Sequence, residues 1–455
     1  LYTVLNYLLE RQCYRATVRL CNNAAVRQSV ALSLCCTKSS HYAQHAFRIT
    51  LLLMLFTSVV SAEELRLQEL IDEALKNNHE ILMAEAKWKT STFRIPQVKS
   101  LPDPIFMIGY QNEGWKRYTF GEMEGAQWMF SASQMFPFPG KLSLKGEMAE
   151  RDSEVLKYAI DSVRLNVIKQ VRELYYDLYL AYKEIDLIRE RAGLFKRIED
   201  AALARYSSGM APQQEVLMAQ TEKYMLLEKE EMLKQKIQSI EAMLNATLGR
   251  DVYSPLGRPA EPARRDLKYS IDELISLAHE ASPSVKSKEK MVSAGKVRVA
   301  IAEKEYYPDF TLTGTVMKRA REFEDMWNLT MAVNIPIFYK TKQRQALNEA
   351  RSLLSETEHE LEATRIMLSS EVRDNYSMLK TAERLMELYK SGLIQKTYQD
   401  FELALTGYVT GKVEAITVIS RLKALLDYET QYWRQYIERE KAIARIEAIT
   451  GIRSQ

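Results

Sequence analysis

Two segments in the second half of the chain alternate apolar with small polar residues, a pattern typical of β-strands that have two different faces. Positions 310–316 read F-T-L-T-G-T-V and positions 327–335 read W-N-L-T-M-A-V-N-I. The pattern predicts a β-hairpin over about residues 308–337. Each strand has about the 9–11 residues that a tilted strand needs to cross a bilayer, although a surface hairpin of a soluble domain fits equally well. The candidate membrane-strand residues are Phe310, Thr311, Leu312, Thr313, Trp327, Leu329 and Met331.

The order of motifs along the chain indicates one structural unit that is present twice. We predict repeats at 63–251 and 252–455, each with a helix, a hairpin and two further helices. The first hairpin is expected at about 103–136, where aromatic residues alternate with serines less regularly. The matching motifs are Leu67–Ile81 with Ser270–Val285, Leu101–Asp103 with Tyr307–Asp309, Phe136–Lys141 with Ile335–Lys340, and Tyr206-x-x-Gly209 with Tyr408-x-x-Gly411.

Proline-free segments of unusual length follow both hairpins and predict long helices. Leucines at 347, 354, 361 and 368 recur every seven positions, which is typical of a coiled-coil seam. Charged residues fill the other faces, so these helices should pack on one another and keep one side in water. Turns are expected at Tyr206, Gly209 and Gly411. The predicted helices cover about 141–206, 212–248, 340–406 and 412–450.

The first 62 residues have the composition of a secretory leader. Residues 47–62 combine a basic start, an apolar core and small residues before a cleavage position, which predicts a signal peptide. Residues 1–46 are then a longer leader or a mis-assigned start. All four cysteines lie in this region, so no disulfide or thiolate metal site is expected after cleavage. The leader holds six of the 63 basic and one of the 60 acidic residues, which leaves 57 against 59. A net charge of −2 gives no reason to expect binding to nucleic acid.

Sequence motifs for catalysis and for cofactor binding are lacking. The sequence has no glycine-rich phosphate loop, and neither His79-Glu80 nor His279-Glu280 continues into a zinc-protease motif. Methionines at 218, 225 and 232 recur every seven residues, which is better explained by packing than by a copper relay. We therefore predict no enzyme activity, no catalytic residues, no cofactor and no metal site.

The predicted hairpins cannot enter a membrane as an open sheet. Lipid offers no partner for the N–H and C=O groups of an edge strand, so a spanning sheet must close on itself. Known membrane barrels have at least eight strands, whereas one chain supplies four. Several copies are therefore required, and three copies would provide twelve strands.

Across 63–455 the sequence resembles the TolC-type outer-membrane efflux family. The resemblance rests on the duplicated order, the Pro-Asp strand starts, the two Tyr-x-x-Gly turns, and the repeat ends A-T-L-G and A-I-T-G. The F-P-F-P-G-K junction is similar to the heavy-metal branch of the Czc and Cus type. The family implies a homotrimer in the outer membrane of a Gram-negative bacterium. Its twelve-stranded β-barrel continues as a periplasmic α-helical barrel, and its partners are a periplasmic adaptor and an inner-membrane pump.

The resemblance also implies a gate at the periplasmic tips. The gate carboxylate and tyrosine of the family match Glu215 and Tyr408, whereas the gate arginine falls on Val413. Lys412 is next to it and could substitute. The acidic ring that the family can carry is absent at its usual positions, and Glu414 is a possible replacement. The alternative for Glu215 is a solvated helix charge.

The predicted function is a passive outer-membrane exit duct for substrates, with metal ions as the predicted cargo, delivered by a pump through an adaptor. Drug efflux and type I protein secretion use the same scaffold and stay open as alternatives. A structural coiled-coil or adhesin protein of the periplasm is an alternative of another class, but it would leave the paired hairpins without a role.

Overall fold

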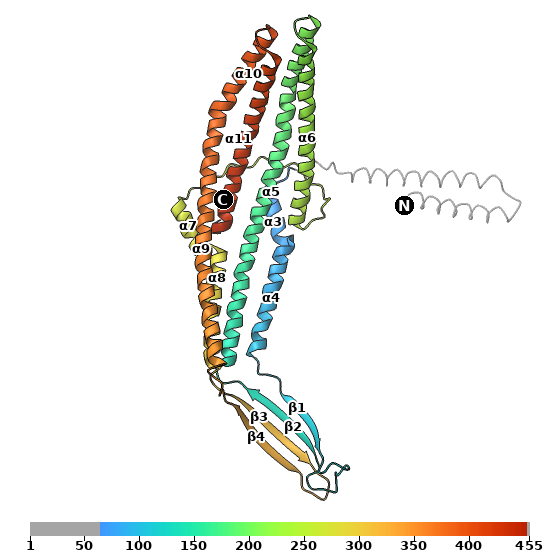
Figure 1. Ribbon diagram of the computed structural model, residues 1–455, viewed down its shortest axis with the longest axis vertical. Coiled ribbons are helices and arrows are strands. Elements are labelled where there is room, and N and C mark those ends of the chain that lie inside the picture. The colour runs from blue at the N-terminus through green and yellow to red at the C-terminus, as the bar shows by residue number, and fades with distance from the viewer. Residues whose placement is uncertain (1–63, 453–455) are drawn as a thin grey trace, which may run out of the picture. The chain divides into compact units, whose positions relative to one another are not determined.

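The computed structural model describes residues 64–452, which belong to one compact unit. The predicted signal peptide and the leader before it lie outside the described residues. Within the unit the strands lie at one end and two helical turns at the other, with long helices between them (Figure 1). The fold class predicted from the sequence, mainly α with a small β part and a duplicated unit, is confirmed.

The same order of elements occurs twice along the chain (Figure 1). The first set consists of α3 (Leu67–Asn77), α4 (His79–Lys99), β1 (Ile105–Gln111), β2 (Gln127–Phe136), α5 (Lys141–Ser207) and α6 (Gln213–Leu248). The second consists of α7 (Ile271–Ala281), α8 (Pro283–Lys304), β3 (Asp309–Lys318), β4 (Met326–Asn334), α9 (Gln343–Leu388), the π-helical turn η1 (Tyr389–Leu393), α10 (Ile394–Val409) and α11 (Ala415–Thr450).

Helix α5 is the central element of the unit. It has 67 residues, which corresponds to a length of about 100 Å at 1.5 Å per residue. It packs against α4 and α8 in the half near the strands, and against α6 and α11 in the half near the turns. The neighbours of α5 therefore change along its length. This one uninterrupted helix connects the half near the strands with the half near the turns.

The helix expected at 340–406 in the second repeat contains a π-helical turn. Helix α9 begins at Gln343, and the five residues of η1 separate it from α10. The hydroxyl of Ser391 donates to the carbonyl of Glu387 at 2.7 Å, and Gly392 follows. A serine that bonds back to the preceding turn, next to a glycine, loosens the regular ladder of hydrogen bonds, which is a local reason for the wider turn.

The four strands form one antiparallel sheet in the order β1-β2-β3-β4. The pairing of β2 with β3 joins the two hairpins and therefore joins the two repeats. Side chains also connect these strands, because the hydroxyls of Ser131 and Thr315 lie 2.9 Å apart and those of Ser133 and Thr313 lie 3.0 Å apart. Strands β1 and β4 form the two edges within the described chain.

A buried lysine fastens the junction between strands and helices. The ammonium of Lys141, at the start of α5, lies 2.9 Å from the carboxylate of Asp309, at the start of β3. The same ammonium donates to the backbone carbonyl of Tyr307 at 3.0 Å, and Asp309 accepts the backbone N–H of Phe138 at 2.8 Å. The lysine of the first strand-to-helix junction and the Pro-Asp start of the third strand therefore meet in space.

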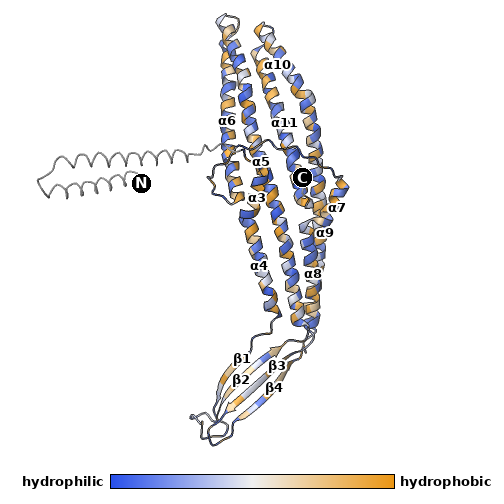
Figure 2. Cartoon of the chain, turned by 180° about the vertical axis from the view of Figure 1, so that it is seen from behind, coloured by the Kyte–Doolittle hydropathy of each residue, from blue (hydrophilic) through white to orange (hydrophobic). Residues whose placement is uncertain are grey.

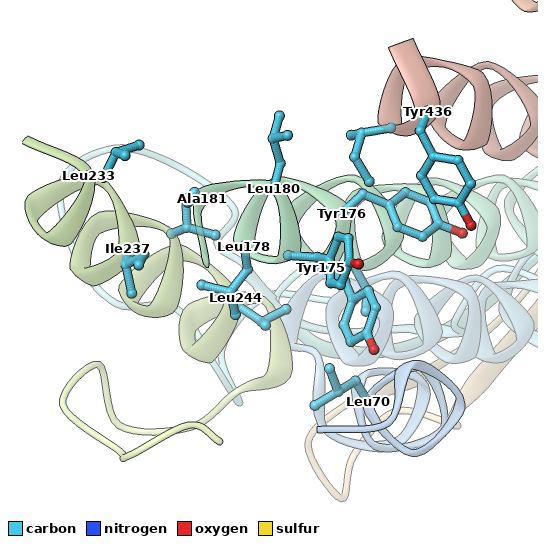
Figure 3. Close-up of a cluster of buried hydrophobic side chains, with 14 of the residues drawn as sticks. Leu70, Tyr175, Tyr176, Leu178, Leu180, Ala181, Leu233, Ile237, Leu244 and Tyr436 are labelled. Carbon is cyan, nitrogen blue, oxygen red and sulfur yellow. The ribbon is translucent and has the colours of Figure 1, made fainter. Parts of the chain in front are cut away.

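The main hydrophobic core lies where α3, α5, α6 and α11 meet (Figure 3). Tyr175 of α5 is one of its largest buried side chains, and its hydroxyl donates to the carbonyls of Leu65 and Ala260 at 3.0 and 2.8 Å. Leu65 also pairs with Pro259 as an isolated parallel bridge. The core thus fixes the segment between the repeats, at 249–270, against the start of the described chain.

Buried charges hold the same segment on α11. The guanidinium of Arg265 contacts Glu440 at 3.2 Å and Glu447 at 3.1 Å, and both carboxylates are almost fully buried. Arg265 also donates to the hydroxyl of Tyr176 at 3.0 Å. Buried charges are tolerated when each has a partner of opposite sign, so this network ties the segment to α11 and α5.

Hydrophilic residues occur along every long helix beside the hydrophobic ones (Figure 2). Within residues 64–452, no helix has the length and the apolar character needed to cross a membrane.

Candidate functional site

The two helical tips have the same local construction. Gly209 and Gly411 have φ values of 73° and 79°, in the left-handed region that glycine adopts without strain. The backbone N–H groups of Met210 and Lys412 then donate hydrogen bonds to the carbonyls of Arg205 and Gly407, respectively, both at 2.8 Å. The turns predicted at Tyr206, Gly209 and Gly411 therefore lie at the two tips.

Glu215 lies in the first tip and matches the gate carboxylate of the family by sequence. Its side chain contacts the second tip. The hydroxyl of Tyr408 in α10 donates to the carboxylate of Glu215 in α6 at 2.7 Å. Tyr408 is fully buried, and its ring packs in a cluster with Val216, Phe401 and Leu405. Burial and the hydrogen bond to Glu215 raise the pKa of Tyr408 above its ordinary value, so the hydroxyl keeps its proton at neutral pH.

An arginine that the sequence analysis did not single out completes this contact. Arg205, in the last turn of α5, donates to the backbone carbonyl of Tyr408 at 2.7 Å. Its guanidinium carbon lies 4.5 Å from the centroid of the Tyr408 ring. A signal for it exists in the repeat, because the position of Arg205 relative to the tip corresponds to Gly407 in the second copy. The difference between Arg205 and Gly407, at equivalent positions of the two repeats, is the sequence signal for this residue.

The structure does not bring the remaining predicted tip residues into this contact. Lys412 and Glu414 are exposed, and within the described part of the chain neither side chain makes a hydrogen bond or ion pair with Glu215 or Tyr408. Glu414 precedes α11 as its N-cap residue without a capping side-chain hydrogen bond. The cation beside Tyr408 within one chain is therefore Arg205 rather than Lys412.

Ion pairs further along the helices connect the two helical hairpins. Arg197 of α5 lies 3.6 Å from Glu402 of α10, and Lys423 of α11 lies 3.1 Å from Glu222 of α6. These pairs are partly exposed, and such pairs typically contribute about 0–1 kcal/mol each. The buried cluster around Tyr408 therefore holds the tips together more strongly than the surface charges do.

At the other end of the unit, the sheet exposes its apolar face. On the central strands, Phe130 and Val316 point to the face that is open to the surroundings, with 47% and 53% of their surface exposed. The opposite face carries Ser131 and Thr315, and Thr315 is only 9% exposed. A sheet in water buries its apolar face, so this arrangement is the reverse of that in a soluble protein and marks a surface that contacts lipid or another chain.

The candidate membrane-strand residues follow this division of the sheet. Cross-strand pairing places Leu312 opposite Met331 and Gly314 opposite Leu329 on the apolar face. Thr313 pairs with Thr330 on the polar face. The residues of the apolar face are Phe310, Leu312, Trp327, Leu329 and Met331, and those of the polar face are Thr311 and Thr313.

In the described part of the chain, histidine and carboxylate side chains do not gather into a metal site. Within residues 64–452, no group of three or more His, Cys, Asp or Glu side chains is placed to hold a metal ion. His279 instead packs between α7 and α9, where its Nε2 lies 2.8 Å from the hydroxyl of Ser369.

Comparisons with known proteins agree with this arrangement. A family model described as "Outer membrane efflux protein" matches residues 70–250 and 274–451, which correspond to the two repeats. The chain is 21% identical over 320 residues to the cobalt-zinc-cadmium resistance protein CzcC of Cupriavidus metallidurans, covering 69% of this chain and 74% of CzcC. It is 22% identical over 387 residues to the probable outer membrane lipoprotein SilC of Salmonella typhimurium, covering 79% and 80%.

Solved structures show the same fold at low sequence identity. The structure of CusC superposes with a TM-score of 0.72 at 15% identity and covers 85% of this chain and 92% of CusC. The outer membrane channel CmeC of Campylobacter jejuni superposes with a TM-score of 0.72 at 16% identity and covers 85% of each chain.

Proposed function

The chain belongs to the outer membrane efflux protein family, and from this membership we propose that three copies assemble into one continuous duct. The membership confirms the resemblance to TolC-type proteins found in the sequence. The protein is the outer-membrane channel of a tripartite efflux system, with a helical part that extends into the periplasm, and it is not an enzyme.

The observation that carries the trimer proposal is the open sheet with an exposed apolar face. Strands β1 and β4 each have a partner on one side only within the described chain, and lipid cannot satisfy their free N–H and C=O groups. Pairing β4 of one copy with β1 of the next satisfies both edges. Three copies give twelve strands, which is within the range of known membrane barrels.

The two faces of the sheet then have different surroundings. The apolar face, with residues such as Phe130 and Leu329, would contact lipid, and the serines and threonines of the other face would line the water-filled passage. The paired serines and threonines of β2 and β3 add no charge to this lining. We propose a passive exit duct on this basis, because nothing in such a lining supplies energy for transport.

The contact between the tips serves as the candidate gate. Glu215, Tyr408 and Arg205 join the α5–α6 tip to the α10–α11 tip of the same chain. Separating the tips would break a buried hydrogen bond and a cation–π contact in each copy, so a threefold arrangement multiplies a modest energy per chain. Binding of an adaptor that prefers the separated tips would open the duct by shifting this equilibrium.

Metal ions are the proposed cargo, and the proposed partners are a periplasmic adaptor and an inner-membrane pump. Support for the cargo comes from the relative CzcC, whose name describes resistance to cobalt, zinc and cadmium. The pump selects the substrate in a system of this kind, so the duct itself needs only to let the ion pass.

Electrical recording in a planar lipid bilayer tests the proposed function. The purified protein should insert as trimers that dissociate on heating and should give stepwise ion conductance. Cysteine is absent after residue 36, so single cysteines placed on β1 and β4 can report pairing between copies. Disulfide-linked trimers support the closed sheet. A protein that stays monomeric in water without detergent and gives no conductance would contradict it.

A further inference from the structure

The two hairpins of one chain meet at an interface that combines strand pairing with a buried ion pair. The pairing of β2 with β3 ends, on the side of the helices, at Phe136 and Phe310. Beside this last pair, the ammonium of Lys141 lies 2.9 Å from the carboxylate of Asp309. Lys141 is only 2% exposed. We call this pairing, together with its ion pair, the internal interface.

The counterparts of this lysine and this aspartate lie at the two open edges of the sheet. In the matched motifs of the repeats, Lys340 corresponds to Lys141, and Asp103 corresponds to Asp309. Lys340 follows β4 and Asp103 precedes β1, which are the edge strands (Figure 1). Both side chains are exposed, and within residues 64–452 neither makes an ion pair or a hydrogen bond. Each edge of the sheet therefore carries one half of a second such interface.

The register of the two hairpins shows that the duplication is preserved in the sheet. The matched motifs fix which position of β1 corresponds to which of β3, and likewise for β2 and β4. By this correspondence, the pair Ile105–Ser133 of the first hairpin becomes Thr311–Ala332 in the second. The structure contains both pairs. A pair of the internal interface can therefore be transferred to its counterpart between β4 and β1.

We propose that the interface between copies repeats the internal interface: β4 of one copy pairs with β1 of the next in the transferred register, and Lys340 binds Asp103 of that next copy. This inference rests on the proposed function, which closes the sheet between copies. It deepens that function by naming the partner as a second copy of this chain and by stating which residues meet.

The transferred register joins the most exposed apolar side chains of the sheet. Ile108 of β1 is 70% exposed within one chain and Met331 of β4 is 61% exposed, and both lie on the apolar face. Pairing them continues that face from one copy into the next. The expected pairs are Val333 with Phe106, Met331 with Ile108, and Leu329 with Tyr110.

Shifting β1 by two residues would keep its faces but would change what happens at the ends of the strands. One shift places Pro104 opposite Val333, inside the ladder, where proline is disfavoured because it has no N–H. The opposite shift moves Asp103 by two residues, or about 7 Å, away from Lys340. The transferred register avoids both, because Pro104 then lies opposite Ile335, just beyond the end of β4.

The helices next to the sheet lack a contact at the same edge. Helix α5, which follows β2, packs against α4 of its own repeat and against α8 of the other repeat. Helix α9, which follows β4, packs against α8, but within the described chain it makes no contact with α4. Because α4 leads into β1, the proposed pairing brings α4 of the next copy beside α9. Strands and helices therefore indicate the same partner.

Paired cysteines test the register. Strands β1 and β4 of one chain are separated by two strands, or about 14 Å, so a disulfide between them must join two copies. The test variant is I108C/M331C, and the matched controls are F106C/M331C and Y110C/M331C, which keep the face but shift the pair by two residues. Shifted pairs have Cβ atoms about 7–8 Å apart, whereas a disulfide needs about 3.5–4.5 Å.

We expect oxidation of I108C/M331C to give covalent trimers that resist heating in detergent and separate on reduction. The two controls should link much less. Stronger linking in either control overturns the register while the duct stands. Trimers are measured by electrophoresis before oxidation in every variant and in the wild type. A wild type without trimers would contradict the proposed function itself and would remove this interface with it.

Reversal of charges tests the ion pair. D103K and K340D should each lower the temperature at which the trimer dissociates, because each places like charges together. The exchange D103K/K340D should regain most of that loss, since it restores opposite charges. The matched control is K342D, because Lys342 is also exposed and lies two residues further along the chain. Recovery of D103K by K342D instead of K340D, or no loss in D103K alone, overturns the pairing of Lys340 with Asp103.

Discussion

The guanidinium of Arg205 lies over the ring of Tyr408, with 4.5 Å between its central carbon and the ring centroid. The same group donates to the carbonyl oxygen of Tyr408 at 2.7 Å. A residue of the first tip therefore holds both the ring and the backbone of a residue in the second tip. The contact is intramolecular, so it can act before any partner binds.

Replacing Arg205 with alanine should open the tips more often. The substitution removes a cation–π contact and a charged hydrogen bond, together worth about 1–3 kcal/mol per chain. We expect a larger closed-state conductance in planar bilayers. Lys412→Ala is the comparison, because Lys412 is exposed and lies outside the contact with Tyr408. A conductance increase in Lys412→Ala but not in Arg205→Ala would assign the gate cation to Lys412 instead.

Removing the hydrogen bond between Tyr408 and Glu215 should have a similar effect. Tyr408→Phe leaves the Glu215 carboxylate without its 2.7 Å partner, at a cost of about 1–3 kcal/mol. Glu215→Ala and Tyr408→Phe should not add, because both single changes break the same bond. The readout is conductance of the two single variants and the double variant. Unaltered conductance in the double variant rules out a gate at this position.

The charge network around Arg265 should contribute strongly to thermal stability. Arg265→Ala leaves Glu440 and Glu447 buried with fewer partners, and breaking a buried pair costs about 3–5 kcal/mol. We expect a clearly lower apparent melting temperature of the protein. Arg264→Ala is the matched control, since Arg264 is exposed and pairs with Asp266 only at 3.7 Å. Equal melting temperatures for both variants would show that the network is not a stabilising element.

Alkaline pH should weaken the core at two tyrosines. Burial raises the pKa of both Tyr175 and Tyr436 to about 12. Their ordinary pKa is about 10, so above that pH the unfolded chain loses these protons before the folded chain does. Stability should therefore stay constant below about pH 10 and fall above it, by on the order of 2 kcal/mol per tyrosine near pH 12.

The measurement is the apparent melting temperature between neutral pH and the alkaline limit. Tyr175→Phe should make the melting temperature fall less steeply with rising pH in the alkaline range. It should also lower stability at neutral pH, because the carbonyls of Leu65 and Ala260 lose their donor. Tyr253→Phe is the control, since Tyr253 is 93% exposed. If the melting temperature of Tyr175→Phe fell with pH as steeply as that of the wild type, Tyr175 would not contribute to the alkaline loss of stability.

Local pattern was sufficient for most of the fold. The alternation at 327–335 determined a strand with a defined apolar face. Leu312 and Met331, which the pattern assigns to apolar faces, are paired in the sheet. Absence of proline determined that the helices are long, and the left-handed glycines determined where they turn. Each of these features depends on the backbone preferences of a few neighbouring residues, which the sequence states directly.

Contacts between distant segments could be identified only in the tertiary structure. The hydrogen bond from Tyr408 to Glu215 could be anticipated only through a family resemblance. The mismatch of Arg205 with Gly407 between the repeats singles out Arg205 but does not place it over Tyr408. Both contacts join helices about 200 residues apart, and they depend on how each helix is rotated about its axis. Sequence periodicity gives the side of a helix that packs but not its partner.

The contact between the hydroxyls of Ser131 and Thr315 shows the same limit in the sheet. Period-two alternation assigns each residue to a face, but a shift of one strand by two residues would keep every face and separate these two hydroxyls. The register that aligns them depends on the pairing of β2 with β3 across the two repeats. The sequence by itself determined the elements and their faces, and only the tertiary structure decided which residues meet, because register and helix rotation depend on contacts that no single segment contains.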